Sequence, residues 1–448
     1  MINVLFIAIE FAPVSTTGNF RSLKFVKYFR DFGINPIVIT LDVDSASRIF
    51  AYAKVDYTLL EDLPEGTNIY RIPCGDLSKY YTNNIRRFLT IYFSTKDKIA
   101  EAWEKGVMNN IQGIIDKHKP EAILATLPPF STGSLAVNIS KTFNLPLIID
   151  MRDGWSKWCL APYGSWLHYY FTYREEKKLF KRADVITTVT DQLADIFRDS
   201  HNEINSDKFK VVTNGYDENL SFEDKIEVQA YQENKEYVIG YTGAFYYYPK
   251  GRRDMMLPWW KKRFHRIFQY SPVKEDWLYR SPYYFFKAVR MVLDNNPRIN
   301  IKIKFIGEKP DWLEPMAAEF SLLENCQFGG VMPRNQMLKV QRSFDAFLCT
   351  SVKVIGNYDY VLASKTFDYL LLHKPLIGFV TEGAQREFIQ DSGIGFICDP
   401  DNISESAQIL EKIILGNYTM TPNIEFLSKF SRLKTAEKLA GLLKSVVR

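Results

Sequence analysis

The chain has 448 residues, of which 46% are hydrophobic and 24% are charged, and its formal net charge is +5. This length exceeds what a single hydrophobic core holds and predicts two globular domains of roughly 200 residues each. No apolar run reaches the ~18 to 20 residues that a membrane-spanning helix needs, so we expect no integral membrane segment.

The cysteines and the amino terminus indicate the compartment. The five cysteines are scattered and never form a CxxC pair, which disfavours both a disulfide framework and a zinc site. Residues 1–13 have no basic region, and their apolar run is too short for a secretory signal. We therefore expect a cytoplasmic protein whose first residues form a buried strand.

In the first half of the chain, short β-branched runs alternate with helical patterns, which is typical of parallel sheets covered by helices. Between the first two runs, Leu23, Val26 and Phe29 form one apolar helix face, and Gly33 is placed to end that helix. The expected strands are residues 3–9, 36–41, 121–126, 146–150, 184–189 and 210–213.

An acidic and amide-rich stretch, residues 219–236, interrupts this alternation and is the expected linker. The pattern resumes with expected strands at residues 237–243, 299–307, 345–350, 375–380 and 395–399. The predicted fold class is α/β, with two doubly wound, Rossmann-like domains, residues 1–218 and 237–424. We expect them to face each other across a cleft, because such sheets bind ligands at the carboxyl ends of their strands.

Sequence motifs of several enzyme classes are absent. There is no GxGxxG after the first strand, no GxxxxGK[ST], no GxSxG and no HExxH, and the five histidines are far apart. These absences disfavour a dinucleotide enzyme, a P-loop protein, a serine hydrolase and a zinc hydrolase.

Two loops of the first half carry candidate ligands at strand ends. Gly18, in STTGNFR, lies at a helix start, where free N–H groups and the helix dipole favour an anion. The loop DMRDGW places Asp150, Arg152 and Asp153 at the end of another strand. A simple turn explains the glycine equally well, and a structural salt bridge explains the charged corner equally well.

The second half carries a similar set. Gly243 and Gly307 follow two of its strands. Further on, Ser364 can cap a helix with Lys365 in its first turn and Asp368 on the same face. Because the helix dipole disfavours a lysine there, its position makes sense if it faces a bound phosphate. The alternative is an exposed ion pair between Lys365 and Asp368.

Taken in order, these segments resemble the GT-B glycosyltransferases, in particular the large retaining family four, or group 1, that uses nucleotide sugars. The matching segments are FAPVSTTGNFRSLKFVKYFRDFG, TLPPFSTGSLAVNIS, PLIIDMRDGW, RADVITTVT, VVTNGYD, GYTGAF, FIGEKP, ASKTFDYLLLHKPLIGF and DSGIGFICDP, which span nearly the whole chain. The resemblance implies a UDP- or GDP-linked sugar donor bound mainly by the second domain. It also implies a last helix, residues 425–448, that completes the first domain.

The resemblance assigns roles to individual residues. Gly18 would approach the donor diphosphate, Arg253 and Lys365 would neutralise it, and Asp368 would hold the ribose hydroxyls. Asp153 would face the reacting sugar, so the catalytic candidates are Asp153, Arg253 and Lys365. The remaining donor-binding candidates are Arg252, Gly243, Gly307 and Ser364. We expect no metal and no cofactor, because these cations suffice to stabilise the leaving diphosphate.

Two departures from the family pattern leave an alternative open. The family often carries two glutamates separated by seven residues, whereas here the second position is Asp368 and the first is Tyr360. The first loop also has one glycine where two are common. The alternative is a sugar-nucleotide or glycan-binding protein of the same fold that has no turnover.

The stretch GRRDMMLPWWKKRFHRIFQYS, within an expected insertion at residues 251–282, combines aromatic and basic residues. Pro258 and Pro272 delimit a predicted amphipathic helix of about four turns. Its apolar face would carry Trp260, Phe264, Ile267 and Phe268, and its basic face Lys261, Lys262, His265 and Arg266. Such a helix is typical of a membrane surface.

Three interpretations of this stretch remain. Trp259, Trp260, Lys261, Lys262 and Arg263 would contact an anionic membrane or a lipid-linked acceptor, or the aromatic side chains would pack onto the second domain. Nucleic-acid binding is disfavoured, because no recognised motif accompanies the basic patch.

The motifs and the family resemblance together predict a hexosyltransferase of cell-surface polysaccharide synthesis, with a glycan or lipid-linked acceptor and no nucleic acid. We expect it to be cytoplasmic and peripheral on the inner face of the cell membrane.

Overall fold

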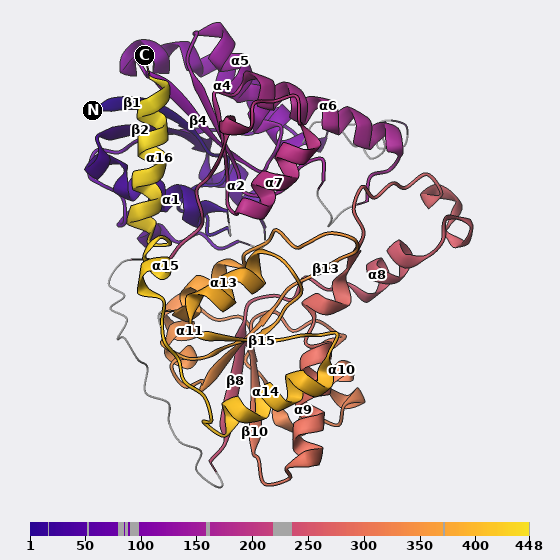
Figure 1. The fold of residues 1–448 in the computed structure, drawn as a ribbon. Helices are drawn as coiled ribbons and strands as arrows, with labels where there is room; N and C mark the ends of the chain where they lie inside the picture. Colours follow the sequence, from indigo (N-terminus) through magenta and orange to yellow (C-terminus); the bar gives the residue numbers. More distant parts are fainter. Residues whose placement is uncertain are drawn as a thin grey trace. The chain divides into compact units, whose positions relative to one another are not determined.

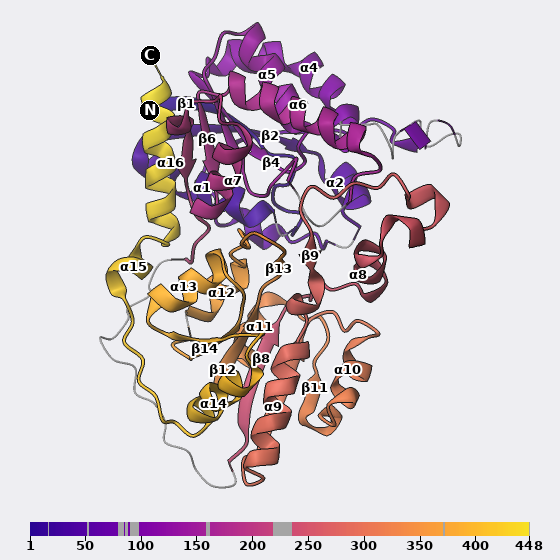
Figure 2. The same ribbon diagram turned by 45° about the vertical axis from the view of Figure 1, so that its right-hand side comes forward.

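The computed structural model describes the chain except residues 17, 52, 79–84, 86–87, 90–97, 158–161, 218–234, 371 and 448. Residues 219–234 of the predicted linker lie outside the described residues. The chain forms two compact units (Figures 1 and 2). Unit 1 comprises residues 1–214, 263–272 and 432–448, and unit 2 comprises residues 215–262 and 273–431.

Within the described residues, unit 1 is built on a seven-stranded parallel sheet in the order β3-β2-β1-β4-β5-β6-β7. The strands are β1 (Ile2–Ile7), β2 (Ile34–Leu41), β3 (Asn68–Ile72), β4 (Ala122–Leu127), β5 (Leu147–Met151), β6 (Val185–Thr188) and β7 (Phe209–Val211). The helices are α1 (Asn19–Phe29), α2 (Val43–Ile49), α4 (Lys98–His118), α5 (Thr132–Thr142), α6 (Trp166–Arg182), α7 (Asp191–Ser200) and α16 (Arg432–Val446).

Unit 2 repeats this plan, with a parallel sheet of six described strands in the order β11-β10-β8-β12-β14-β15. The strands are β8 (Tyr237–Thr242), β10 (Ile301–Ile306), β11 (Cys326–Phe328), β12 (Ala346–Thr350), β14 (Leu376–Phe379) and β15 (Gly395–Cys398). The helices are α8 (Pro249–Met256), α9 (Tyr283–Asn295), α10 (Leu313–Glu319), α11 (Arg334–Gln341), α12 (Ser364–Leu370), α13 (Ala384–Ser392), α14 (Ile403–Ile414) and α15 (Ile424–Ser428). β9 (Glu275–Asp276) and β13 (Lys353–Val354) form a separate short antiparallel pair.

The expected fold class, two Rossmann-like domains, is confirmed by the strand order. In each parallel sheet, the strand that comes first in the chain lies between the second and the fourth strands of that sheet. The predicted helix face of α1 is also confirmed. Leu23, Val26 and Phe29 are fully buried, and Gly33 ends this segment with a positive φ of 72°. Glycine adopts that backbone conformation without the steric cost of a Cβ atom.

The carboxyl-terminal segment forms two helices rather than the single predicted one. α15 belongs to unit 2, and α16 belongs to unit 1. α16 lies beside α1 (Figures 1 and 2), and its buried side chains join the core of unit 1. They are Ala436, Leu439, Ala440 and Leu443. The chain thus returns to unit 1 seven residues later than the sequence suggested.

The predicted four-turn helix within residues 251–271 is wrong. Instead α8 ends at Met256, and two short 3₁₀ turns follow, Trp259–Lys261 and Phe264–Arg266. Pro258 and Lys262 have ψ of 150° and 153°, which is extended backbone that a helix cannot contain. The aromatic and basic side chains of this stretch therefore do not share one helical face.

The interpretation that the aromatic stripe of this stretch packs onto the second domain is also wrong. Trp259, Trp260, Phe264 and Phe268 are 64%, 66%, 87% and 72% exposed. Residues 263–272 join unit 1, whereas the two tryptophans belong to unit 2. None of the described helices combines the length and apolarity needed to span a membrane.

Candidate functional site

Two of the predicted donor-site glycines meet at the carboxyl ends of β8 and β10 in unit 2. Gly243 has a φ of 96° and Gly307 a φ of 140°, which are conformations that favour glycine. A Cβ atom on Gly307 would lie 2.6 Å from the carbonyl oxygen of Gly243. The glycines therefore let two loop backbones approach each other, and they are more than turn residues.

Lys365 approaches the same point from the first turn of α12. A Cβ atom on Gly243 would lie 3.8 Å from Lys365 Nζ, and that Nζ lies 3.6 Å from the ring centroid of Tyr241. Burial lowers the pKa of Lys365 to about 7, and the nearby Cys349 opposes this shift. Among the described residues no carboxylate lies within ion-pair distance of Lys365, so its charge has the ring of Tyr241 as its main compensation.

A buried network that the sequence did not reveal fixes this corner. The Tyr241 ring stacks on Phe245 with centroids 3.9 Å apart. The Tyr369 hydroxyl, also on α12, accepts from the backbone N–H of Thr242 at 2.9 Å. Gln341 in turn donates to the Thr242 hydroxyl at 3.1 Å. These contacts tie α12 to the end of β8 and hold Lys365 in place.

The arginines expected at the diphosphate are arranged differently. Arg252 forms a bidentate pair with Asp276, with nitrogen–oxygen distances of 2.5 and 2.8 Å, so its charge is already compensated. Arg253 is exposed on α8, and its side chain has no hydrogen bond or ion pair with the described part of the chain. Of the two, Arg253 retains an uncompensated charge.

The other predicted residues of unit 2 occupy surface or half-buried positions. Ser364 is the exposed first residue of α12, and Asp368 is half-buried on that helix. Lys261 is exposed and Lys262 half-buried, beside the exposed Trp259 and Trp260. The structure thus brings together Gly243, Gly307 and Lys365, and it places Ser364 and Asp368 on the same short helix.

A buried carboxylate next to Tyr360 was missed in the sequence. Asp359 accepts hydrogen bonds from the backbone N–H groups of Val361 at 2.9 Å and Val352 at 3.2 Å. Burial raises the pKa of Asp359 to about 6, against the opposing effect of Arg280. Tyr360 itself is buried. The acidic residue of this region therefore lies one position before the one that the family pattern marks.

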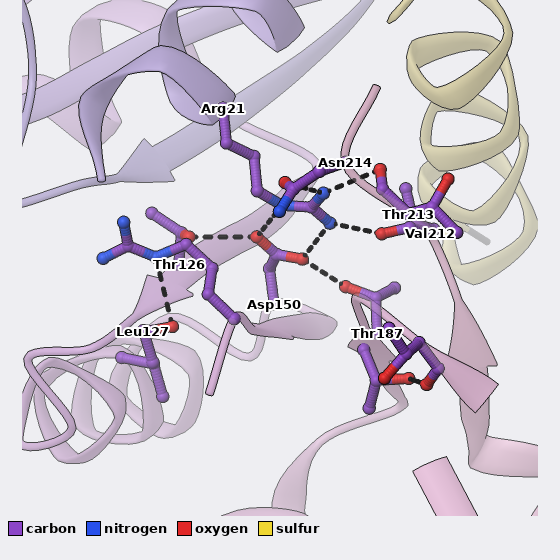
Figure 3. Close-up of polar contacts among 11 residues, drawn as sticks. Arg21, Thr126, Leu127, Asp150, Thr187, Val212, Thr213 and Asn214 are labelled. Carbon is purple, nitrogen blue, oxygen red and sulfur yellow. Dashed lines mark hydrogen bonds and ion pairs between the residues drawn. The ribbon is translucent and has the colours of Figure 1, made fainter. Parts of the chain in front are cut away.

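In unit 1, Asp150 is the centre of a buried salt bridge at the carboxyl ends of several strands (Figure 3). Arg21 donates to it through Nη2 at 2.8 Å and Nε at 3.0 Å. The hydroxyls of Thr126 and Thr187 donate at 2.9 and 2.7 Å. Burial alone would raise the pKa of Asp150, but these partners bring it below its usual value.

The remaining donors of Arg21 are also satisfied. They reach the carbonyl oxygens of Val212 and Thr213 and the side chain of Asn214 at 2.7, 2.9 and 3.1 Å (Figure 3). This saturated pair confirms the salt-bridge interpretation of the DMRDGW corner for Asp150. Its role is to join α1 to β5 and to the chain that follows β7.

The predicted phosphate loop around Gly18 is lined by a second ion pair. Arg152 Nη2 lies 3.2 Å from Glu10 Oε1, and Arg152 also donates to the carbonyl oxygens of Leu127 and Pro128. A Cβ atom on Gly18 would overlap with Arg152 and Glu10. Gly18 therefore makes room for charged side chains here. Asp153 follows Arg152 and is half-buried.

Three buried polar atoms, one in this loop and two in the first turn of α1, have no hydrogen-bond partner in the described part of the chain. They are Thr16 Oγ1, Asn19 Oδ1 and Ser22 Oγ. Buried polar groups are normally paired with protein, water or ligand, so an unpaired group near a helix start indicates a wet or ligand-contacting site. The anion-binding role of the loop at Gly18 stays a prediction.

The comparisons with known proteins address the fold and one segment. Residues 280–425 match the family model of the glycosyl transferases group 1. The lipopolysaccharide outer core galactosyltransferase WaaB in its apo form is similar at 12% identity and a TM-score of 0.58, with 99% of both chains covered. Anabaena HepE in complex with UDP is similar at 13% identity and a TM-score of 0.54, with 99% of this chain and 100% of that chain covered.

A third similar structure is UDP-GlcNAc 2-epimerase from Methanocaldococcus jannaschii, at 10% identity and a TM-score of 0.50, with 99% of this chain and 100% of that chain covered. No curated protein matches the chain. At these identities the structures establish the fold alone. The structures confirm the two-domain fold that the sequence predicted, and the family model confirms the resemblance to the glycosyl transferases group 1 over residues 280–425 of the second unit.

Proposed function

We propose that this protein transfers a hexosyl group from a UDP- or GDP-linked donor to a hydroxyl of a glycan or lipid-linked acceptor in cell-surface polysaccharide synthesis. The observation that carries the proposal is the site at Lys365 in unit 2. A lysine with a pKa of about 7 and no carboxylate partner among the described residues stands beside two glycine loops at strand ends. A bound diphosphate would raise the pKa of Lys365, because it favours the charged form, and it would pair with that charge.

In the proposed reaction, the bond between the sugar C1 and the donor phosphate oxygen breaks, and the nucleoside diphosphate leaves with the bonding electron pair. The acceptor hydroxyl oxygen forms the new bond to C1, and its proton passes to an oxygen of the leaving diphosphate. Negative charge therefore develops on the leaving diphosphate, and preorganised cations lower the barrier. We assign this stabilisation to Lys365 and Arg253, without a metal ion and with retention at C1.

The other predicted residues keep the roles that the family resemblance implies. We propose Asp368 for the ribose hydroxyls, and Gly243, Gly307 and Ser364 for the backbone that lines the donor. Asp153 is the proposed contact to the reacting sugar, and Gly18 the proposed loop residue near the diphosphate. Arg252 is not assigned to the diphosphate, because Asp276 already holds it. The UDP found in the similar structure of HepE supports a nucleotide donor.

Donor binding tests the proposal directly. Thermal shift with a panel of UDP- and GDP-sugars reports binding, since a ligand stabilises the folded state with the logarithm of its saturation. We expect Lys365→Met to weaken binding about tenfold or more. Lys339→Met, which removes an exposed lysine on α11, is the matched control and leaves affinity unchanged. Equal affinity of Lys365→Met and the natural protein would disprove the assigned site.

The alternative function is a sugar-nucleotide or glycan-binding protein without turnover. The buried Tyr360 at the first acidic position of the family pattern favours it. Release of free nucleotide from the bound donor, alone and with candidate acceptors, separates the two functions. Transfer or slow hydrolysis supports the enzyme, and binding without either across all donors supports the binding protein.

A further inference from the structure

Six large apolar side chains are exposed on two segments of unit 1. One segment is the first turns of α6, and the other is residues 263–272. The six residues, here called the aromatic face, are Trp166, Leu167, Tyr170, Phe171, Phe264 and Phe268. Their exposed fractions range from 37% to 87%. Exposed apolar surface of this extent indicates a binding surface.

The α6 part of the face results from a helix that buries only its opposite side. The buried positions of α6 are Thr172, Glu176, Leu179 and Phe180. The exposed apolar residues follow the spacing i, i+1, i+4 and i+5, so they share the outer side of the first turns. Trp166 and Tyr170 stack with ring centroids 5.3 Å apart, which makes one flat aromatic surface.

Residues 263–272 are joined to the same part of unit 1. Tyr163, just before α6, and Tyr270 exchange backbone hydrogen bonds of 2.8 and 3.0 Å. The Tyr270 ring also lies 4.9 Å from that of Tyr169 on α6. Phe268 precedes Tyr270 by two residues, which limits their separation to about 7 Å. The two segments are therefore neighbours within unit 1.

Basic residues adjoin the aromatic face, and the nearest acidic side chain on the exposed part of α6, Glu175, is paired with Lys178. Arg174 is exposed, and its guanidinium lies 5.8 Å from the Tyr170 ring centroid. Arg263 is exposed at the start of the second segment. The sequence has no acidic residue between Asp153 and Glu175, and none between Asp254 and Glu275. A partner that fits this face is apolar and anionic.

We infer that the aromatic face docks on an anionic phospholipid bilayer and lies in its headgroup region. Tryptophan and tyrosine rings suit that region, because one edge is apolar and the other accepts or donates hydrogen bonds. Arginines beside them add attraction to anionic lipids. A second copy of the chain fits less well, because a self-paired face would set Arg174 and Arg263 against like charges. The inference goes beyond the proposed reaction, since it holds with or without turnover.

Vesicle flotation of the full chain tests the inference. We expect binding to vesicles that contain phosphatidylglycerol, and much weaker binding to pure phosphatidylcholine. The double variants Trp166→Ser/Tyr170→Ser and Phe264→Ser/Phe268→Ser each lower the partition coefficient about tenfold or more. The control Tyr57→Ser/Val331→Ser removes two apolar side chains elsewhere that are 64% and 73% exposed, and it binds as the natural protein does.

Several outcomes overturn the inference. They are no binding of the natural protein to anionic vesicles, equal binding to both lipids, and aromatic-face variants that bind as well as the control. Dimers in light scattering that the same variants abolish would assign the face to a second copy instead. Thermal shift with a nucleotide sugar is measured on each variant as well. If donor binding persists while the vesicle results contradict the lipid inference, the lipid inference fails and the proposed function stands. Trp259→Ser/Trp260→Ser, in the neighbouring segment of unit 2, then shows whether the tryptophans add to the binding.

Discussion

Lys365 and Tyr241 form a cation–π contact in which the ammonium nitrogen lies 3.6 Å from the ring centroid. Tyr241 is itself buried and stacked on Phe245, so the ring cannot turn away without breaking that stack. The contact holds the lysine at the strand ends while giving it less compensation than a carboxylate would. This explains why a pKa of about 7 coexists with a well-fixed side chain.

Donor affinity is therefore expected to depend on pH. The pKa of Lys365 is about 7 in the free protein, so the side chain is charged below pH 7 and neutral above it. A bound diphosphate raises that pKa, because it favours the charged form. The dissociation constant for a nucleotide sugar then rises by up to about tenfold per pH unit above pH 7. Calorimetric titration between pH 6 and 9 measures this.

A nucleotide sugar is the suitable ligand for that titration, because its diphosphate is a diester without a titration near pH 7. Lys365→Met is expected to bind weakly with a flat pH profile over the same range. A pH profile that remains steep in this variant would assign the titration to another group.

The close approach of Gly307 and Gly243 predicts an intolerant position. Gly307→Ala places a Cβ atom 2.6 Å from a backbone oxygen at a φ of 140°, and neither loop relieves the overlap without moving. We expect a loss of about 2 to 4 kcal/mol in the free energy of unfolding, measured by urea denaturation, together with weaker donor binding.

The matched control for this variant is Gly356→Ala. Gly356 has a φ of 76° with no atom within 4 Å of an added Cβ, so it tests the backbone conformation alone. Its expected cost is about 1 kcal/mol, with donor affinity unchanged. If the two variants lost equal stability, the backbone contact would not be the cause.

Most strands found from the sequence have largely buried apolar runs, such as β1, β4 and β14. The missed strand β3 lies at the edge of its sheet and is only partly buried, so its residues NIYRI carry no apolar run. The missed strand β11 has three residues, again at an edge. Edge strands as short or as polar as these two are defined by their neighbours, which a single sequence does not show, whereas the edge strands β7 and β15 were predicted.

At the candidate site, the sequence suggested individual residues but did not reveal the contacts between them. The motif around Lys365 indicated an anion site, which stays a prediction, and the structure places Gly243 and Gly307 beside that lysine. The ring beneath it, Tyr241, and the anchor Tyr369 were missed, because aromatic residues in strand and helix patterns are usually core residues. Arg252 was predicted at the diphosphate because nothing in the sequence links it to Asp276, which is 24 residues away.

The buried pair of Arg21 and Asp150 predicts strong coupling. Asp150→Asn leaves the buried guanidinium without its counter-charge and is expected to cost about 3 to 5 kcal/mol in unfolding free energy. Arg21→Met leaves the carboxylate unpaired and has a similar cost. Once both charges are removed, neither penalty remains, so the double variant loses less than the two single variants combined. Urea denaturation of the four proteins measures this cycle, and additive losses would show that the two charges act independently.

Asp359 predicts the opposite pH dependence to an ordinary carboxylate. Its pKa of about 6 in the folded protein exceeds that of an unfolded chain, so folding disfavours the charged form. This cost is fully present above pH 6 and is relieved as pH falls towards 4. Relative to Asp359→Asn, the natural protein should gain about 2 kcal/mol in unfolding free energy between pH 7.5 and 4.5. Other carboxylates titrate in both proteins and cancel in the difference, so urea denaturation at the two pH values isolates this group. A difference that stays constant or falls would show that the two backbone N–H groups, and not burial, control the Asp359 charge.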